Sequence, residues 1–283
     1  MQAKIYKIIS FDNLKMVKKI GVDLGGTYLR VGVIENNKVR KYIKKSTPRN
    51  QKDLVEEMAK SISECMSKDV VGIGVASPGP LKDGIIYNTP NLPFKKFDLK
   101  KFLQNKFKKR VEVKNDAHCV ALAEAKFGCK KKNFIVITLG TGVGGGIIID
   151  GKLYEGEGYA GEIGHLVLDG GKYLETLWQL NRKELQASFG TNFLKDIFDK
   201  KDERAKKLIE EICVYLGQAL GSVINIFDPE VIILMGGIRE TGSRLIKMLN
   251  KEVKKYTILP KIPPIKWSKL DHPGILGAGL LID

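Results

Sequence analysis

The sequence predicts a two-lobed α/β fold built from two similar halves. Two stretches share one plan, KIGVDLGGTYLRVGVIENNKV from Lys19 and FIVITLGTGVGGGIIIDGKL from Phe134. Each reads as a β-branched strand, a glycine-rich turn, a second strand and a tight polar turn into a third strand. Around these hairpins strands alternate with helices, a pattern typical of α/β rather than all-α or all-β proteins. The recurrence of the hairpin predicts a cleft between the halves.

The apolar periodicity places helices and strands on both sides of a boundary near residue 115. We expect a smaller N-terminal α/β lobe over 1–115 and a larger C-terminal lobe over 116–273. The Gly/Ala-rich helix 274–283 is a candidate to rejoin the first lobe. Helices are predicted at 50–67, 98–108, 117–128, 203–226 and 241–255, and strands at Val70–Val75, Val111–Lys114, Phe134–Leu139 and Val231–Met235.

The composition excludes several classes of protein. The chain has 283 residues, 43% of them hydrophobic, and no apolar run long enough to span a membrane. The N-terminal residues lack the pattern of a secretory signal, so we expect a cytoplasmic protein. Four cysteines are dispersed without a C-x-x-C pair, which favours buried free thiols; they are Cys65, Cys119, Cys129 and Cys213.

The net charge of +16 raises nucleic acid as a partner. Nine Lys or Arg residues lie between Lys95 and Lys114, but apolar residues are interleaved with them at helical spacing. Such a segment is typical of an amphipathic helix whose lysines face water. No nucleic-acid-binding signature accompanies the charge, so we expect neither a nucleic-acid nor a membrane partner.

The glycine-rich turns of the two hairpins are the candidate phosphate site. The first hairpin places Asp23 directly before Leu24-Gly25-Gly26-Thr27. A carboxylate there can hold Mg²⁺, directly or through water, while the following N–H groups and the Thr27 hydroxyl meet phosphate oxygens. An Asp before a glycine turn is also a common turn residue. The chain has no G-x-x-x-x-G-K-[ST] motif, and LGTGVGGG is followed by a strand instead of a helix.

A second group of polar residues suits a polyhydroxylated ligand. Asn115-Asp116 ends a strand and begins a helix, where both are ordinary capping residues. His118 reads as a capping or packed histidine. Sugar hydroxyls need both hydrogen-bond donors and acceptors, which carboxylates, amides and an imidazole supply together. The candidate residues are Asn91, Asn115, Asp116, Glu162, His165 and Glu175.

Seven short motifs follow one another along the chain from about residue 18 to its end. They are DLGGT at 23–27, GVASPGPL at 74–81, NTPNLPF at 88–94, VKNDAHCVALAEAKFG at 113–128, LGTGVGGGIIIDGKLYEG at 139–156, AGEIGH at 160–165 and DPEVIILMGG at 228–237. In content, order and spacing the chain resembles the ROK family of sugar kinases. The resemblance implies an actin-like, ribonuclease-H-like fold of two duplicated lobes, with ATP and a hexose meeting in the cleft.

The resemblance also implies roles for individual residues. Asp116 would be the general base that accepts the proton of the attacking sugar hydroxyl. The six polar residues named above would be the sugar ligands, and Asp23 would hold Mg²⁺. The contacts implied for ATP and its phosphates are Asp23, Gly25, Gly26, Thr27, Thr141 and Gly142, with Gly236 and Gly237 near the nucleoside.

Two departures from the family pattern matter. ROK repressors carry an N-terminal winged-helix domain, whereas only about 18 residues precede the first predicted strand here, which disfavours a regulator. The family's zinc loop, C-x-C-G-x-x-G-C-x-E, is replaced by LVLDGGKYLE after His165. One imidazole cannot hold structural zinc, which needs about four ligands, so we expect no zinc site. Glu175 is aligned with the final Glu of the family loop across this shortening.

The leading hypothesis is an ATP- and Mg²⁺-dependent hexose kinase that phosphorylates glucose at its 6-hydroxyl. Alternatives within the class are an N-acetylmannosamine or N-acetylglucosamine kinase and a fructokinase. The alternative from another class is a sugar- and nucleotide-binding sensor without turnover. The resemblance further implies a homodimer, although no stripe in the sequence indicates one.

Overall fold

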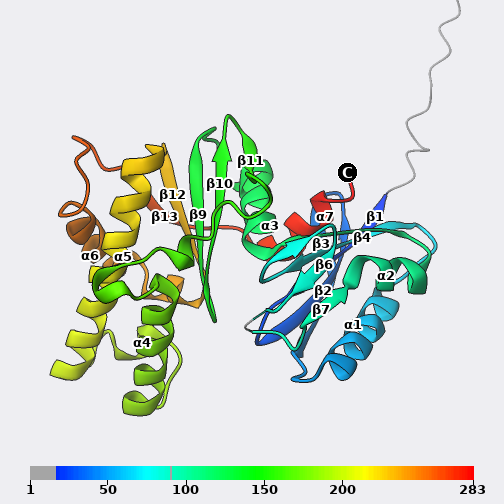
Figure 1. The fold of residues 1–283 in the computed structure, drawn as a ribbon, viewed down its shortest axis with the longest axis horizontal. Coiled ribbons are helices and arrows are strands. Elements are labelled where there is room, and N and C mark those ends of the chain that lie inside the picture. Colours follow the sequence, from blue (N-terminus) through cyan, green and yellow to red (C-terminus); the bar gives the residue numbers. More distant parts are fainter. Residues whose placement is uncertain (1–16, 90) are drawn as a thin grey trace, which may run out of the picture.

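Two five-stranded sheets form the framework of the chain over the residues that the computed structural model describes, 17–89 and 91–283 (Figure 1). The first sheet contains, in the order β3-β2-β1-β4-β8, the strands β3 (Lys38–Ser46), β2 (Tyr28–Glu35), β1 (Lys18–Leu24), β4 (Val70–Ser77) and β8 (Arg110–Asn115). The second contains, in the order β11-β10-β9-β12-β13, the strands β11 (Lys152–Tyr154), β10 (Val143–Ile149), β9 (Phe134–Leu139), β12 (Val231–Met235) and β13 (Ile265–Trp267).

The two sheets have the same topology. In each of them, the first three strands in sequence form an antiparallel meander, and two later strands add in parallel beside the first. β1 in the first sheet therefore corresponds to β9 in the second, and each is followed by a glycine-rich turn. This repeat confirms the predicted duplicated α/β fold.

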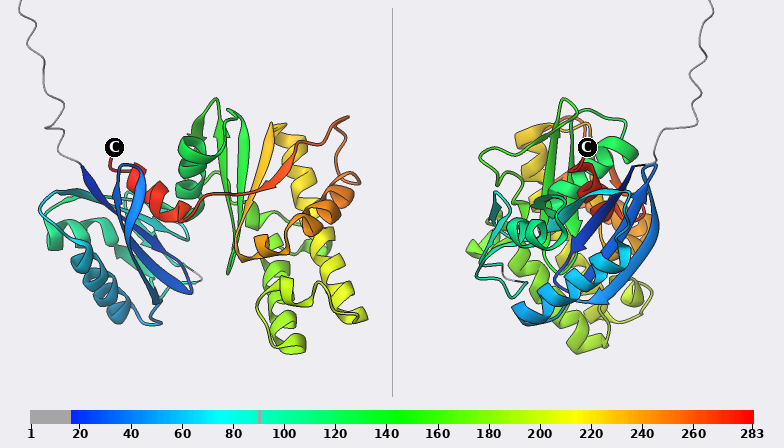
Figure 2. Two further views of the ribbon diagram at one scale, coloured as in Figure 1. Left: turned by 180° about the vertical axis from the view of Figure 1, so that it is seen from behind. Right: turned by 90° about the vertical axis from the view of Figure 1, so that its right-hand side faces the viewer.

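Helices cover both faces of the first sheet (Figures 1 and 2). Ile20, Val22 and Leu24 point to one face of β1, where they pack in one core with residues of α1 (Gln51–Cys65) and α2 (Leu99–Phe107). On the opposite face, Gly21 of β1, Gly32 of β2 and Gly74 of β4 lie against α7 (Pro273–Leu280). A methyl group at Gly74 would lie 1.7 Å from the carbonyl oxygen of Ala278. Only glycine therefore allows the terminal helix to pack this closely on the sheet.

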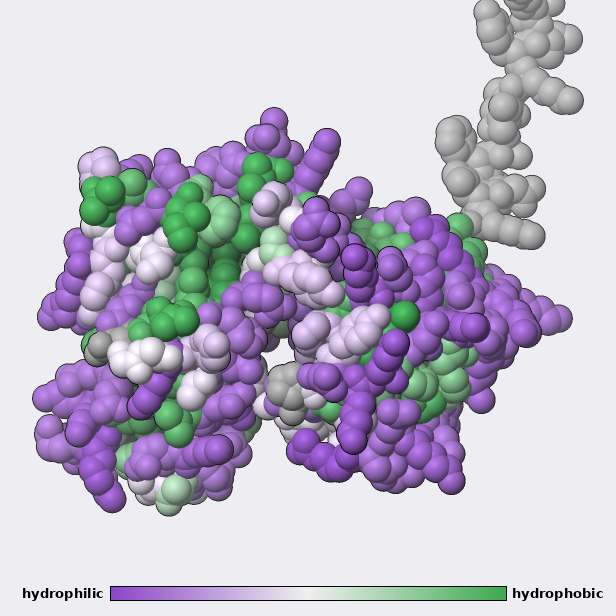
Figure 3. Space-filling view, in the orientation of Figure 1, coloured by the Kyte–Doolittle hydropathy of each residue, from purple (hydrophilic) through white to green (hydrophobic). Residues whose placement is uncertain are grey.

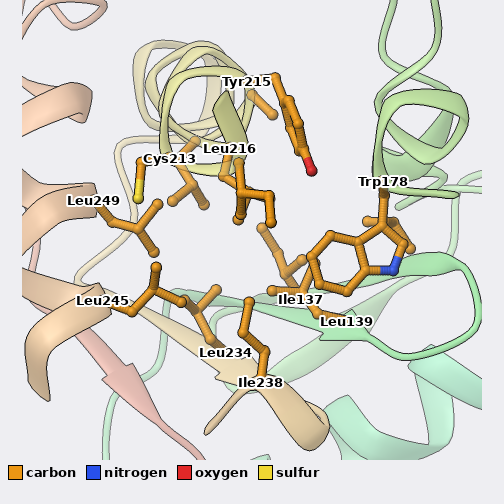
Figure 4. Packing of buried hydrophobic residues seen from close by; sticks show 14 of the residues in the cluster. Ile137, Leu139, Trp178, Cys213, Tyr215, Leu216, Leu234, Ile238, Leu245 and Leu249 are labelled. Atoms are coloured by element: carbon orange, nitrogen blue, oxygen red, sulfur yellow. The ribbon is translucent and has the colours of Figure 1, made fainter. Parts of the chain in front are cut away.

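The second sheet is covered in a similar way. The larger core of the protein lies between one face of this sheet and three helices, α4 (Leu174–Phe189), α5 (Glu203–Phe227) and α6 (Ser243–Val253). Figure 4 shows side chains of these helices meeting Leu139 of β9 and Leu234 of β12. On the opposite face α3 (Asp116–Ala123) contacts β9 and β10.

Helices α3 and α7 lie at the centre of the molecule, between the two sheets (Figure 1). Cys119 of α3 and Ala278 of α7 are buried together with Ala76 of β4. The chain leaves the first sheet at Asn115 and begins α3 at Asp116. We retain the lobe boundary at 115/116 as a proposal, with α7 joined to the first lobe because it contacts β1 and β4 as well as α3.

Shorter elements complete the chain. The predicted helix 117–128 is α3 continued by a π-helix, Glu124–Gly128, and the terminal helix is shorter than predicted. A small sheet that the sequence analysis did not predict consists of β5 (Leu81–Lys82), β6 (Ile85–Tyr87) and β7 (Lys96–Asp98). Among the described residues, the 3₁₀ helices are Ile163–His165, Asp169–Gly171, Leu194–Ile197 and Gly237–Thr241.

Three predictions from composition and charge can be compared with the fold. All four cysteines are free thiols; three are buried as predicted, whereas Cys129 is only half-buried because it follows the π-helix at the surface. Within 17–89 and 91–283, no helix is long and apolar enough to cross a membrane. The basic segment around α2 is amphipathic as predicted, since Leu99 and Leu103 are buried and Lys101 and Lys106 are exposed.

Candidate active site

The turns of the two glycine-rich hairpins meet. Residues 25–27 join β1 to β2, and residues 140–142 join β9 to β10. The hydroxyl oxygens of Thr27 and Thr141 lie 3.1 Å apart, within hydrogen-bond distance, and both residues are exposed. Figure 3 shows a hollow between the two parts of the molecule with a mostly hydrophilic rim. The structure thus brings together the two turns to which the sequence analysis assigned one phosphate site.

The first turn leaves backbone donors free. The Thr47 hydroxyl donates to the carbonyl of Gly25 at 2.6 Å, which fixes the start of the turn. Asn91 packs directly on the turn, since a methyl group at Gly26 would lie 2.9 Å from its Cβ. Among the described residues, the N–H groups of Gly26 and Thr27 have no hydrogen-bond partner. Both N–H groups can therefore donate to the phosphate oxygens of a ligand.

Asp23 lies at the end of β1, beside the first turn. Its side chain is 23% exposed, and Nη1 of Arg30 donates to its carboxylate at 3.0 Å. Burial raises the pKa of Asp23, and the Arg30 charge acts in the opposite direction. Mg²⁺ in nucleotide sites binds one or two carboxylates and completes its shell with water and phosphate oxygens. One carboxylate next to two phosphate turns fits this donor set, and Asp23 is the residue that would hold the ion.

Asp116 is the first residue of α3 and is half-buried. Its pKa is raised from 3.8 to about 7, first by burial and then by the negative charges of Asp23 and Glu162. The N–H of Ala117 donates to Oδ1 at 2.8 Å and acts in the opposite direction. The structure therefore gathers carboxylates from three distant parts of the sequence. A carboxylate with a pKa near neutrality is suited to accept a proton.

Asn115 and His118 support the beginning of α3. Oδ1 of Asn115 accepts from the N–H groups of Ala117 at 2.9 Å and His118 at 3.2 Å, which confirms the predicted cap. The Asn115 amide group is left to donate to a ligand. His118 is buried, and its Nε2 is 2.7 Å from the carbonyl oxygen of Ala160. His118 thus links α3 to the loop that carries Glu162, in agreement with its interpretation as a packed histidine.

Glu162 directly precedes a short 3₁₀ helix in that loop, and His165 is the last residue of that helix. Nδ1 of His165 lies 3.5 Å from Oε2 of Glu162, and both side chains are about half exposed. The His165 ring contacts the Tyr173 ring at 5.4 Å between centroids. Over the described ranges 17–89 and 91–283, no cluster of three His, Cys, Asp or Glu side chains has the arrangement of a metal site. A cavity of about 440 Å³ adjoins this loop, lined among others by Gly79, Asn115, His118 and Glu162.

Glu175 lies in the first turn of α4, where it contacts the second hairpin turn. Its Oε2 accepts from the N–H of Val143 at 2.7 Å, and its Oε1 accepts from Gln179 at 3.1 Å. A methyl group at Gly142 would lie 2.3 Å from Oε2, so any side chain there would displace the Glu175 carboxylate. The sequence analysis grouped Glu175 with Glu162 and His165. In the structure both carboxylate oxygens instead have partners on α4 and the phosphate turn, and a sugar contact of Glu175 stays a prediction.

Gly236 and Gly237 follow β12 and lie next to the second turn. Gly236 has φ +131°, and a methyl group there would lie 2.0 Å from the carbonyl oxygen of Leu139. The aromatic ring of Phe193 lies 3.9 Å from the position of a Cβ on Gly237, and Phe193 is half exposed. The structure therefore adds an exposed aromatic side chain to the region assigned to the nucleoside. The sequence carried no signal for it because Phe193 lies in an irregular segment.

Two further side chains of α4 reach the second turn. Nε1 of Trp178 donates to the carbonyl of Gly140 at 2.9 Å, and Arg182 donates to the same oxygen. Neither contact was predicted from the sequence. The sequence feature that could have indicated these contacts is the spacing of Glu175, Trp178 and Arg182. They are three and then four residues apart, which places them on one face of a helix.

Two duplicated sheets whose glycine-rich turns meet beside the carboxylates of Asp23 and Asp116 are the arrangement of an actin-like sugar kinase. The family model described as ROK family matches residues 19–184 and 171–283. The chain belongs to the ROK family. The predicted ROK sugar kinase with an actin-like two-lobe fold is therefore confirmed.

Individual relatives agree with this assignment. A glucokinase of Halalkalibacterium halodurans is 30% identical over 93% of this chain and 94% of its own. A xylose repressor of Bacillus spizizenii is 31% identical over 85% of this chain and 70% of its own. The crystal structure of a ROK glucokinase from Streptomyces griseus, in complex with glucose and AMPPNP, superposes with a TM-score of 0.82 at 25% identity. That alignment covers 93% of this chain and 98% of the glucokinase.

Proposed function

We propose that this protein transfers the terminal phosphoryl group of ATP, bound with Mg²⁺, to the 6-hydroxyl of glucose. The observation that carries the proposal is the position of Asp116. It lies at the end of the first sheet, where burial, followed by the negative charges of Asp23 and Glu162, raises its pKa to about 7. A base with this pKa is half ionised near neutral pH and can accept a proton from a hydroxyl group.

The step balances without a covalent intermediate. The sugar hydroxyl loses its proton to the Asp116 carboxylate, its oxygen forms a bond to the terminal phosphorus, and the bond from that phosphorus to the leaving oxygen of ADP breaks. Asp23 would hold Mg²⁺, which neutralises charge on the phosphate chain when it is bound. The N–H groups of Gly26 and Thr27 orient phosphate oxygens. Asn91, Asn115, Glu162 and His165 are the proposed sugar ligands.

Relatives of two kinds bear on the substrate. The relatives named glucokinase support glucose as the substrate, and the relative named xylose repressor supports the alternative of a sensor. A carboxylate poised as a base favours the kinase, because a sensor needs no proton acceptor. N-acetylmannosamine, N-acetylglucosamine and fructose are the alternative acceptors. A cytoplasmic location and a homodimer complete the proposal, and light scattering of the purified protein tests the dimer.

Release of ADP in the presence of Mg²⁺ tests the proposal. The panel consists of glucose, mannose, fructose, N-acetylglucosamine and N-acetylmannosamine, with 6-deoxyglucose as the matched control that lacks the accepting hydroxyl. We expect the highest kcat/KM with glucose and no ADP release above background with 6-deoxyglucose. If the protein binds sugar and ATP but releases no ADP with any of the sugars, it would instead be the sensor without turnover.

A further inference from the structure

Helix α4 holds the second phosphate turn through one of its faces. Glu175 accepts the N–H of Val143, while Trp178 and Arg182 both donate to the carbonyl of Gly140. The three side chains are spaced three and four residues apart, so they point in one direction from the helix. Figure 4 shows the Trp178 ring extending from α4 beside Leu139, the residue before the turn. Among the described residues, the side chains that hydrogen-bond to the backbone of Gly140 and Val143 all come from α4.

Arg182 differs from the other two members of this face because it carries a positive charge. It is half-buried, and burial lowers the pKa of its guanidinium group. Among the described residues, no carboxylate oxygen lies within 4.0 Å of it, and its one hydrogen bond is to the Gly140 carbonyl. By contrast, Arg30 and Arg244 each pair with an aspartate. Partial burial of a cation without an anion is unfavourable unless a ligand supplies the anion.

The space next to this charge is suited to an anionic ligand. A methyl group at Gly140, the residue whose carbonyl Arg182 contacts, would meet no atom within 4 Å, so the space at that Cβ position is open. The exposed Thr141 hydroxyl follows in the same turn and contacts Thr27 of the first turn. A guanidinium group has five N–H donors in a planar fork, which matches phosphate oxygens, and only one of its nitrogens is engaged here.

We infer that Arg182 contacts the phosphate chain of the nucleotide bound at the second turn and contributes its charge to nucleotide affinity. The inference rests on the proposed function and adds a nucleotide-binding residue to it. A guanidinium group bound to the carbonyl of the turn keeps a fixed position and has donors left for phosphate. The competing explanation is structural, namely that Arg182 only fixes the Gly140 carbonyl. Trp178 already donates to that oxygen at 2.9 Å.

Three variants of Arg182 separate charge from structure. Arg182→Gln keeps an N–H donor for the carbonyl and removes the charge, Arg182→Lys keeps the charge, and Arg182→Ala removes both. Lys183→Gln is the matched control, because it removes one positive charge from the next, exposed residue of the same helix. Thermal unfolding without ligand shows whether each variant is folded. The Gln and Lys variants keep the test decisive if the Ala variant does not fold.

Calorimetric titration of the full chain measures dissociation constants for Mg·ATP and for adenosine, which lacks phosphate. We expect Arg182→Gln to weaken Mg·ATP binding by a factor on the order of 10 and to leave adenosine and glucose binding unchanged. Arg182→Lys should bind Mg·ATP more tightly than Arg182→Gln, and Lys183→Gln should bind it like the wild type.

Two results would overturn the inference and leave the proposed function standing. One is an Arg182→Gln variant that binds Mg·ATP as tightly as the wild type. The other is a loss that is equal for adenosine and Mg·ATP, or equal in the Gln and Lys variants, because a structural role predicts both. A wild-type protein that binds no adenine nucleotide at all would instead refute the proposed function, and the inference with it.

Discussion

Replacement of Asp116 by Asn should remove nearly all turnover and at the same time stabilise the protein. The raised pKa means that ionisation of Asp116 lowers the free energy of unfolding. A rise from 3.8 to about 7 corresponds to at most about 4 kcal/mol. The unfolded chain ionises near the lower value and the folded chain near the higher one. The stability that protonated Asp116 contributes is therefore complete below about pH 4 and is lost as the pH rises through 7.

The Asn side chain is neutral at every pH and has almost the same size. Asp116→Asn should therefore unfold at higher urea concentration than the wild type at pH 8, and at a similar concentration near pH 4. Turnover, measured as ADP release with saturating sugar, should fall by a factor on the order of 10² to 10⁴. For the wild type, kcat/KM should rise with pH through about 7, because only the ionised carboxylate accepts a proton.

Asp150→Asn is the matched control for this prediction. It makes the same chemical change at an exposed residue in the turn between β10 and β11, where φ is +51° and Asn is well tolerated. Neither its activity nor the pH dependence of its stability should differ from the wild type. An Asp116→Asn variant that retains wild-type turnover would refute the catalytic assignment. An unchanged pH dependence of stability would refute the electrostatic argument.

Three other predictions concern the metal, the cleft and the shortened loop. Asp23→Ala should raise the Mg²⁺ concentration needed for half-maximal activity and should lower the activity with every sugar alike. A loss of activity with some sugars only would instead place Asp23 in the sugar site. Binding of sugar and nucleotide should close the lobes, because closure excludes water that competes as phosphoryl acceptor. Small-angle scattering should then show a more compact protein with both ligands than without them. Unchanged scattering profiles would favour a rigid binding protein. Metal analysis of the purified protein should find no stoichiometric zinc. Glu175→Ala should raise the KM for sugar. An unaltered KM would show that Glu175 only stabilises the hairpin turn that it contacts.

The local features of the fold were predictable from the sequence. Strand and helix periodicity depends on neighbouring residues, and the helix predicted at 203–226 is α5 with bounds within one residue. The recurrence of the hairpin predicted the duplication, since two copies of one pattern fold into two copies of one topology. The cap at Asn115 was predictable for the same reason, because it involves residues two and three positions away. Short strands such as β5 have too few residues for a period, and the sequence analysis missed them.

The sequence by itself determined which residue types are available to the site. Asp23 and Asn115-Asp116 end or follow parallel strands of one sheet, and the carboxyl ends of such strands meet at one edge. Only the tertiary structure decided how the second half completes the site. It brings Glu162 close enough to raise the pKa of Asp116, places Thr141 on Thr27, and directs Glu175 to the turn it contacts. These contacts depend on the packing of α3 and α7 between two sheets, and no local pattern in the chain encodes the distance between elements so far apart in sequence.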